Sequence, residues 1–153
     1  MKSIVELKSV SPVDDDVREM IRRLDHFHIL LYGSVSCELD SPETLMKSNA
    51  YMLGSFHDGL LVGIGAVKLF DEYAEIKRMF VMDSHRGLGI AKKILSELEM
   101  YAKQQNRNTV KLETGQKQTS AIRLYEQCGY KPIPPFGNYK PTSVNLYFEK
   151  HLF

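Results

Sequence analysis

The sequence predicts an α/β (α+β) fold, with one mixed, mostly antiparallel, twisted sheet of about six or seven strands flanked by about four helices. Two observations predict it. Apolar runs joined by tight-turn residues imply neighbouring antiparallel strands in the first half of the chain. In the second half, helix patterns alternate with strand patterns, as the crossover of a parallel strand pair requires. The 153 residues, 43% hydrophobic and 25% charged, suit a single domain, 1–153, with one core.

The first 50 residues predict one strand and two helices. Ile4–Val10 alternates weakly in hydrophobicity, which indicates a strand. Ser11-Pro-Val-Asp-Asp-Asp16 then opens a helix, because proline and acidic residues favour helix N-termini. Its apolar residues recur at helical spacing, at Val17, Met20, Ile21 and Leu24. Ser41-Pro42-Glu43 starts a second, short helix for the same reason.

Three strands follow. Ala50–Phe56 and Leu60–Phe70 are apolar runs joined by His57-Asp-Gly59, and Asp-Gly between two such runs is a strong hairpin signal. Tyr73–Met82 is the third strand, after a turn at Asp71-Glu72. We expect these strands to form an antiparallel meander.

The second half alternates helix and strand patterns. The predicted elements are a helix over Ile90–Ala102, a strand over Thr109–Glu113, a helix over Ser120–Gln127 and a strand over Val144–Phe148. The first of these helices has one apolar face, made of Ile90, Ile94, Leu95, Leu98 and Tyr101. Gly129 can cap the second helix. Pro132, Pro134, Pro135 and Gly137 make the segment before the last strand a rigid loop.

Composition excludes several classes of partner. The net charge is +1 and Lys and Arg are scattered, so we expect no nucleic acid. No apolar run reaches the roughly 18–20 residues that span a bilayer, so we expect no membrane. Met1–Lys8 mixes charge into its apolar residues and does not resemble a signal peptide. Cys37 and Cys128 lie far apart, without a CxxC spacing, so we expect a reducing, cytoplasmic location.

The most informative segment is Met79–Ala91, a strand that runs through a glycine-bearing turn into a helix. A helix start has unpaired N–H groups and a partial positive charge. Without Cβ atoms, Gly87 and Gly89 let phosphates approach this backbone closely. The alternative is a tight strand-to-helix turn that binds no ligand.

This turn resembles the acetyl-coenzyme A binding motif of the GNAT acetyltransferase superfamily, which reads Arg or Gln, two residues, Gly, one residue, then Gly or Ala. Arg86, Gly89 and Ala91 match it. Downstream, Ala121-Ile-Arg-Leu-Tyr125-Glu-Gln-Cys-Gly129-Tyr130 resembles the family's second signature. The resemblance covers residues 50–150. Only the order of elements matches in residues 1–50, where members of the family differ by substrate.

The resemblance implies that residues 50–150 are an acetyl-CoA-binding core and that residues 1–50 are a variable acceptor-side part. The implied cofactor-binding residues are Met79, Phe80, Val81, Arg86, Gly87, Leu88, Gly89, Ile90, Ala91, Gln118 and Tyr125. Gln118 departs from the family, where many members carry Asn as a contact to the pantetheine arm. Its amide has the same donors and acceptor, one methylene farther out.

The resemblance also implies three catalytic groups. The backbone N–H of Met79, four residues after Glu75, corresponds to the group that polarises the thioester carbonyl. Glu75 corresponds to the general base of some members. Strand parity puts Glu75, Lys77, Met79 and Val81 on one face and Ile76, Arg78 and Phe80 on the other, with Glu75 about 13 Å from Met79, which favours action through water. The alternative is an exposed Glu75 paired with Lys77 or Arg78.

Tyr125 corresponds to the residue that protonates the departing thiolate in many members, and a phenol with a pKa near 10 can do so. The alternative is a half-buried tyrosine that packs with Leu124 and Tyr130. Cys128 is expected to be a small buried hydrophobic residue rather than a nucleophile. No His, Cys or acidic residue completes a metal-ligand spacing with His26 or His28, and His85 is expected to be a turn residue.

These residues together predict an N-acetyltransferase that moves acetyl from acetyl-CoA to a primary amine of a small molecule in a ternary complex. The expected substrate-binding residues are Phe27, Tyr32, Glu75, Phe136 and Tyr139. Phe27–Tyr32 is the aromatic-rich part of the first two helices, and Pro134–Tyr139 resembles a loop of bacterial small-molecule members. A peptide or protein acceptor is an alternative, although the only acidic clusters are Asp14–Asp16 and Glu38–Glu43. A CoA-binding sensor without turnover is another. A homodimer fits the family, but no segment indicates one.

Overall fold

A single mixed sheet forms the centre of the protein in the computed structural model, which describes residues 5–33 and 40–152. Its strand order is β1-β2-β3-β4-β5-β7-β6. The strands are β1 (Val5–Ser9), β2 (Ala50–His57), β3 (Leu60–Leu69), β4 (Ala74–Val81), β5 (Thr109–Gly115), β6 (Lys131–Ile133) and β7 (Asn145–His151). The helices are α1 (Asp15–Tyr32), α2 (Pro42–Lys47), α3 (Ile90–Gln104) and α4 (Thr119–Gln127), and η1 (Asp83–His85) is a 3₁₀ turn. The predicted fold class is confirmed.

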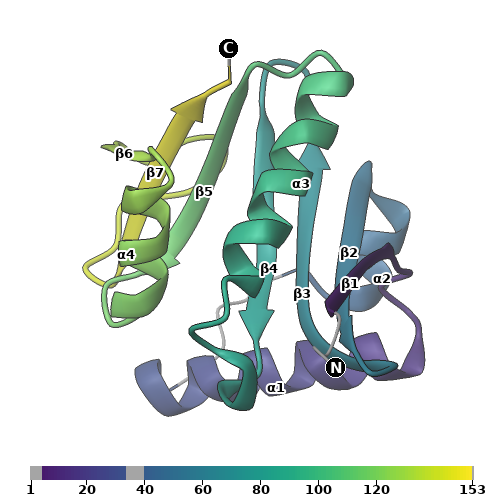
Figure 1. Ribbon diagram of the computed structural model, residues 1–153. Coiled ribbons are helices and arrows are strands. Elements are labelled where there is room, and N and C mark those ends of the chain that lie inside the picture. Colours follow the sequence, from purple (N-terminus) through teal and green to yellow (C-terminus); the bar gives the residue numbers. More distant parts are fainter. Residues whose placement is uncertain (1–4, 34–39, 153) are drawn as a thin grey trace.

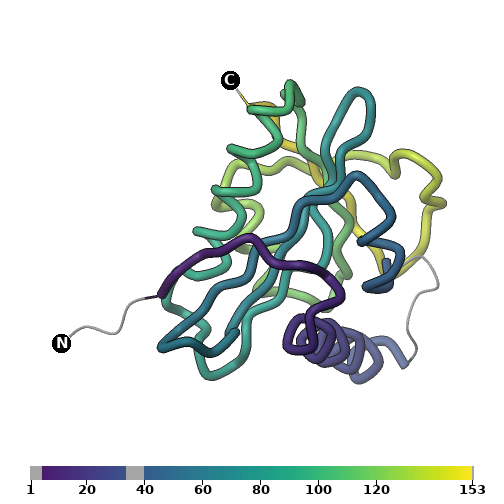
Figure 2. Tube along the Cα trace, turned by 90° about the vertical axis from the view of Figure 1, so that its right-hand side faces the viewer, coloured from purple at the N-terminus to yellow at the C-terminus, as the bar shows by residue number. Residues whose placement is uncertain are grey.

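Helices cover both faces of the sheet. Figure 1 shows α3 and α4 in front of the strands and α1 passing behind the lower end of β4; in Figure 2, turned by 90°, α3 and α1 lie on opposite sides of the strands. The α3 face carries the larger core, which includes Ile94, Leu95 and Leu98. The α1 face carries a second core, in which α1 and α2 pack on the sheet through Val17, Met20, Ile21, Leu45, Met52, Ile64 and Ala66.

Local sequence signals explain the turns and helix ends. Asp58 and Gly59 both have positive φ, 51° and 83°, as the two-residue hairpin between β2 and β3 requires. The Ser41 side chain accepts a hydrogen bond from the Thr44 N–H at 3.1 Å and caps α2. At α1, Asp14 occupies the N-cap position and Gly33 ends the helix in the left-handed conformation. The predicted hairpin and both predicted helix starts are confirmed.

Strand β4 contains a bulge at the centre of the sheet. Lys77 pairs with Ala66 and Phe80 with Ile64, so two residues of β4 lie opposite the one residue Gly65 of β3. Arg78 takes a φ of 56°, which is rare for a residue with a Cβ. A bulge adds one residue to a strand and resets its alternation of faces.

The predicted alternation of faces along β4 is therefore wrong beyond Lys77. Arg78 joins Glu75 and Lys77 on the α1 face, where it forms an ion pair with Asp25 of α1. Met79 and Val81 pack instead with Ile76 in the core on the α3 face. Phe80 packs in the α1-side core. The side chain of Met79 thus points away from the face that carries Glu75.

The parallel pair β4–β5 separates after three residues. Its register ends at Ile76 and Leu112, although β4 continues to Val81 and β5 to Gly115. Beyond this point β5 is paired on its other side, by β7 down to Gly115 and Asn145. The two strands diverge toward the lower end of Figure 1. The free edge of β4 beyond Ile76 includes the bulge and Met79.

Two short elements were not predicted: β6 and the 3₁₀ turn η1. Strand β6 is only three residues long and contains Pro132, so it carries little pattern. Ile4, at the start of the predicted first strand, lies outside the described residues, as do Cys37 and Glu38. In the described part of the chain, no helix combines the length and the apolar character that crossing a membrane demands.

Gly65 is expected to be intolerant of any side chain. A Cβ there would lie 2.5 Å from Met79 Sδ and 2.6 Å from Ile94 Cγ2, between the bulge and α3. We expect Gly65→Ala to lower the free energy of unfolding by about 1–3 kcal/mol through overpacking. Gly63→Ala is the matched control, because its nearest neighbours lie at 3.3 Å on the same face of the same strand. Urea denaturation measures both, and equal losses would contradict this role of Gly65.

Candidate active site

The glycine turn after β4 presents open backbone at the start of α3. Gly87 and Gly89 have φ values of 80° and 78°, and a Cβ built on either one meets no atom within 4 Å. Gly89 is the N-cap of α3, so the first N–H groups of that helix follow it directly. Leu88 between them is 65% exposed. The turn therefore offers an unobstructed helix N-terminus, which suits the binding of a phosphate.

Arg86 stabilises this turn. Its Nε donates to the Val81 carbonyl at 3.2 Å and lies 3.2 Å from Asp83 Oδ1. Its guanidinium also lies 5.7 Å from the centre of the Phe27 ring of α1. These contacts connect the end of β4, the turn and α1.

Gln118 lies where β5 ends and α4 begins. Its Oε1 accepts the Gly115 N–H at 2.9 Å and the Tyr32 hydroxyl at 3.4 Å. The Tyr32 hydroxyl also accepts the Lys117 N–H at 3.2 Å. Tyr32 covers Gly115 so closely that a Cβ at this glycine would collide with its hydroxyl. The end of α1 thus packs directly on the wide end of the divergence between β4 and β5.

Tyr125 is buried on α4 in the α3-side core and stacks edge-to-face on Tyr130 at 5.7 Å. Burial raises the pKa of its phenol far above the ordinary value of 10.0, with a smaller contribution from Cys128. The phenol is therefore protonated at any physiological pH.

Glu75 is the centre of a buried polar cluster on the α1 face of β4. Its side chain is 3% exposed. Its Oε2 accepts a hydrogen bond from the Tyr139 hydroxyl at 2.6 Å and lies 3.2 Å from Lys77 Nζ. Lys77 Nζ donates to the same hydroxyl at 2.7 Å and lies 3.7 Å from Asp40 Oδ2. One lysine thus lies between two carboxylates, beside a phenol that donates to one of them.

Burial raises the pKa of Glu75 above its ordinary value of 4.5. The charge of Lys77 and the hydrogen bonds from Tyr139 and Lys77 act in the opposite direction, because they stabilise the ionised carboxylate. The alternative prediction is an exposed Glu75 paired with Lys77 or Arg78. Glu75 is buried, so the predicted exposure is wrong, but Lys77 is its partner. Arg78 pairs instead with Asp25 at 2.9 Å.

Aromatic rings line one side of the cluster. Phe136 lies between Tyr73, Tyr139 and Tyr147, with ring centres at 5.6, 5.2 and 5.9 Å. The structure thus brings the predicted residues Phe136 and Tyr139 together beside Glu75. No periodic signal in the sequence marks Lys77, Asp40, Tyr73 or Tyr147, which come from separate segments and meet only in the folded chain.

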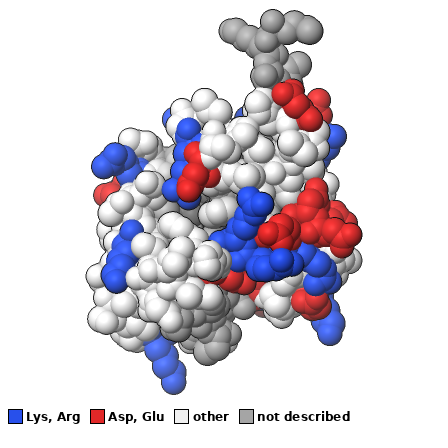
Figure 3. Space-filling model, turned by 90° about the horizontal axis from the view of Figure 1, so that it is seen from below, with Lys and Arg blue, Asp and Glu red and all other residues white. Residues whose placement is uncertain are grey.

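The described residues carry no candidate metal centre, since they contain no group of three or more His, Cys, Asp or Glu side chains suited to hold an ion. The face seen from below in Figure 3 shows basic and acidic side chains side by side rather than one continuous field of one sign. Such a mixed surface gives no electrostatic footprint for nucleic acid on that face.

The comparisons with known proteins agree with this geometry. The model of the acetyltransferase (GNAT) family matches residues 16–130. The chain belongs to the GNAT acetyltransferase family. It is 35% identical over 150 residues to the IAA acetyltransferase of Azospirillum brasilense, covering 97% of this chain and 98% of that protein.

Solved structures show the same GNAT fold. An acyl-CoA N-acyltransferase structure from Klebsiella pneumoniae superposes with a TM-score of 0.84 at 31% identity, covering 98% of this chain and 99% of that one. A streptothricin acetyltransferase structure from Bacillus anthracis, in complex with acetyl coenzyme A, superposes with a TM-score of 0.61 at 26% identity, covering 70% of this chain and 65% of that one.

In this GNAT acetyltransferase, the predicted acceptor residues do not form one group. Phe27 packs against Phe80 with ring centres 6.3 Å apart, and Tyr32 lies at Gln118. Neither forms a ring contact with Phe136 or Tyr139 in the described residues. The predicted wall therefore splits into two parts, one at the glycine turn and the end of β5, the other at Glu75.

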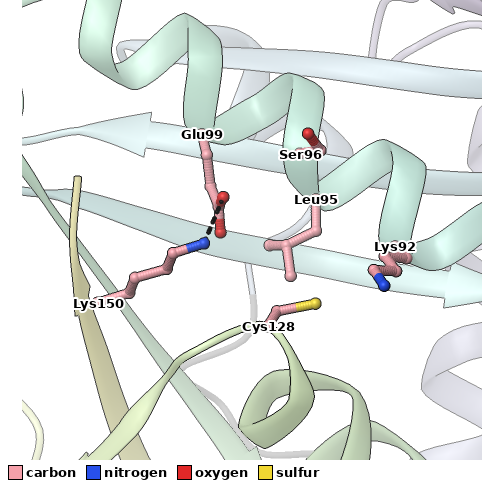
Figure 4. Close-up of a pocket in the computed structure, with 6 residues that line it drawn as sticks. All are labelled: Lys92, Leu95, Ser96, Glu99, Cys128 and Lys150. Atoms are coloured by element: carbon pink, nitrogen blue, oxygen red, sulfur yellow. Dashed lines mark hydrogen bonds and ion pairs between the residues drawn. The ribbon is translucent and has the colours of Figure 1, made fainter. Parts of the chain in front are cut away.

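Two cavities among the described residues lie near α3, α4 and the end of β4. One, of about 260 Å³, lies between α3 and the end of α4 and is lined by Lys92, Leu95, Cys128 and the ion pair of Lys150 and Glu99 at 3.0 Å (Figure 4). Cys128 is half-buried rather than fully buried, and burial raises the pKa of its thiol, which disfavours the reactive thiolate. The other, of about 290 Å³, lies beside the end of β4 and is lined by Arg23, Phe80, Met82, Asp83 and Ser84.

The raised pKa of Glu75 has a consequence for stability. The folded protein holds the Glu75 proton more tightly than the unfolded chain does, so this residue makes the free energy of unfolding fall as pH rises from 4.5 toward the raised value. We expect the difference in the free energy of unfolding between wild type and Glu75→Gln to show this fall when urea denaturation is repeated at a series of pH values. Exposed Glu97→Gln controls for the loss of one charge, and a difference that is flat with pH would contradict the assignment.

Proposed function

We propose that this GNAT enzyme transfers the acetyl group of acetyl-CoA to the primary amine of a small molecule by direct attack in a ternary complex. The observation that carries the proposal is Glu75, a buried carboxylate with a raised pKa on the α1 face of β4, next to the point where β4 and β5 separate. The name of the Azospirillum relative, IAA acetyltransferase, favours a small acceptor.

On this proposal, acetyl-CoA approaches from the α3 and α4 face. Its pyrophosphate would bind the N–H groups around Arg86–Ala91, where no Cβ obstructs the backbone at Gly87 or Gly89. Its pantetheine arm would enter the divergence between β4 and β5, near Phe80, Val81 and Gln118. The Gln118 acceptor oxygen is already bonded to Gly115 and Tyr32, so its NH₂ group would make the contact.

The N–H of Met79 is proposed to polarise the thioester carbonyl. Met79 follows Arg78 in the bulge, on the part of β4 that β5 has left, so its backbone can meet a ligand there. A preformed donor aimed at the developing oxyanion contributes on the order of 3 kcal/mol to catalysis.

Proton transfers complete the reaction. The amine nitrogen attacks the thioester carbon, forming the C–N bond, and the collapse of the intermediate breaks the C–S bond. Glu75, acting through water, takes the amine proton, and Tyr125 gives a proton to the departing CoA thiolate. A raised pKa makes Glu75 a stronger base. The raised pKa of Tyr125 keeps its phenol protonated until the thiolate forms, but it also makes the phenol a weaker acid. Phe136 and Tyr139 would bind the acceptor beside Glu75.

The first test is thiol release from acetyl-CoA across amino acids, polyamines, aminoglycosides and short peptides. We expect turnover on one class of small amine. Turnover on peptides alone would favour the protein acceptor instead. Thermal stabilisation by acetyl-CoA without turnover on any of these amines would favour a CoA-binding sensor. Failure to bind acetyl-CoA would refute the proposal.

Tyr125→Phe is expected to lower kcat by on the order of 100-fold with little change in the KM for acetyl-CoA, because only the proton donor is lost. Tyr130→Phe is the matched control. Its ring is the edge-to-face neighbour of Tyr125, but its hydroxyl donates to Glu99 at 2.7 Å. Steady-state kinetics of thiol release measure both variants. Equal rates for wild type and Tyr125→Phe would remove Tyr125 from the mechanism.

The acid limb of the pH profile of kcat/KM is expected to report Glu75, since the base must be ionised. Tyr139→Phe removes a hydrogen bond that favours the ionised carboxylate, so the pKa of Glu75 rises further and the limb shifts to higher pH. Tyr73→Phe is the control, because it removes a phenol from the same aromatic cluster and leaves the bond from Tyr139 in place. A limb that shifts to lower pH, or stays fixed, would contradict the role of Glu75.

A further inference from the structure

Arg78 is a deeply buried cation on the α1 face of β4, the face that carries Glu75. Its side chain is 3% exposed, and its only ion pair among the described residues joins Nη2 to Asp25 Oδ1 of α1 at 2.9 Å. It occupies the left-handed position of the β4 bulge, directly before Met79. Its side chain lies on the face that carries Glu75, opposite the face of Met79's own side chain.

The Arg78 guanidinium has N–H donors that have no hydrogen-bond partner within residues 5–33 and 40–152. It offers five N–H donors in a fixed plane, yet its Nε and Nη1 are buried without a hydrogen-bond partner in the described part of the chain. Buried donors are almost always satisfied, and each one left bare costs stability. Each exception calls for an explanation, such as a catalytic role or a bound water or ion.

The described charged and polar neighbours of Arg78 do not supply partners for its Nε and Nη1. Asp25 reaches only Nη2 within ion-pair distance. The pKa of His28 is lowered, by burial and then by the charge of Arg78, so this imidazole is neutral at physiological pH and brings no charge of its own. Phe80, two residues along β4, supplies an apolar surface with Phe27. Two unused donors thus lie near an apolar surface, which is the chemistry that would recognise an anion with an apolar part.

We propose that Arg78 binds a carboxylate of the acceptor, so that the acceptor is an amino acid, with amine and carboxylate in one small molecule. The planar fork of a guanidinium matches a carboxylate through two parallel hydrogen bonds. Arg78 is next to the N–H proposed for the oxyanion and about 10 Å along the strand from Glu75. A carboxylate held there keeps the amine of the same molecule near the thioester, with room for one water before Glu75.

This inference rests on the proposed acetyl transfer. Pairs of acceptors with and without a carboxylate show whether the carboxylate site or the acetyl transfer itself fails. L-phenylalanine, L-leucine and L-tryptophan are compared with phenethylamine, isopentylamine and tryptamine, which lack only the carboxylate. We expect wild type to favour the amino acid in at least one pair by about tenfold or more in kcat/KM. In Arg78→Lys, which keeps the charge and loses the fork, kcat/KM should fall by at least about tenfold more on the amino acid than on the amine.

The informative quantity is the loss of kcat/KM on the amino acid divided by the loss on the matched amine. It distinguishes carboxylate binding from a difference in amine basicity and from a purely structural role of Arg78. The different amine pKa values within a pair cancel, because the same two compounds are compared on two enzymes. A purely structural ion pair predicts that Arg78→Lys and Asp25→Asn slow both members of each pair alike. On our proposal Asp25→Asn keeps the preference for the amino acid. Thermal stabilisation by acetyl-CoA verifies that each variant folds.

Product binding tests the same site without turnover. With the CoA-loaded protein, we expect calorimetry to show tighter binding of N-acetyl-L-phenylalanine than of N-acetylphenethylamine, and loss of the difference in Arg78→Lys. Turnover of amines with no carboxylate preference, or a preference that Arg78→Lys leaves intact, overturns the assignment of Arg78 and keeps the acetyltransferase. No turnover with any amine and no product binding overturns both.

Discussion

The interruption of β4 is the constraint on which the rest of the structure depends. A strand in the middle of a sheet normally has both edges hydrogen-bonded, and a bare edge inside a protein is costly. Here β4 keeps β3 on one edge but loses β5 after Ile76. The bulge at Arg78 adds one residue at this place, and Gly65 makes room for it opposite. The sheet tolerates the defect because α3 packs on one side of it and α1 on the other.

The defect explains why polar groups are buried beside it. Burying an ion costs several kcal/mol unless other groups compensate, and breaking such a pair leaves an uncompensated charge. Glu75 is compensated by Lys77 and the Tyr139 hydroxyl, and Lys77 also faces Asp40. A core optimised for stability alone would hold apolar side chains at these positions. A carboxylate with a raised pKa, one residue before β5 leaves β4, therefore suits the proposed proton transfer better than it serves folding.

The elements could be predicted because each leaves a local pattern, and the bulge could not because it leaves none. Asp58-Gly59, Ser41-Pro42 and the apolar stripe of α3 determine their structures within a few residues. The faces of β4 depend on how β3 and β5 pair with it, so simple alternation placed Met79 on the wrong side. The same limit applies to the acceptor wall. Phe136 and Tyr139 reach the cluster around Glu75, whereas the course of α1 takes Phe27 to Phe80 and Tyr32 to Gln118.

The two faces of β4 then divide the proposed reaction between them. The open glycine turn and Tyr125 belong to the α3 and α4 side, whereas Glu75 and Arg78 belong to the α1 side. An acetyl group must pass from one side to the other, and a continuous strand would block it with paired backbone. The bulge and the divergence remove that pairing at Met79 and reverse which side chains face α1 from Arg78 onward. One extra residue in one strand thus puts a cation on the same face as the carboxylate and next to an unpaired stretch of backbone, which the strict alternation of a regular strand would not do.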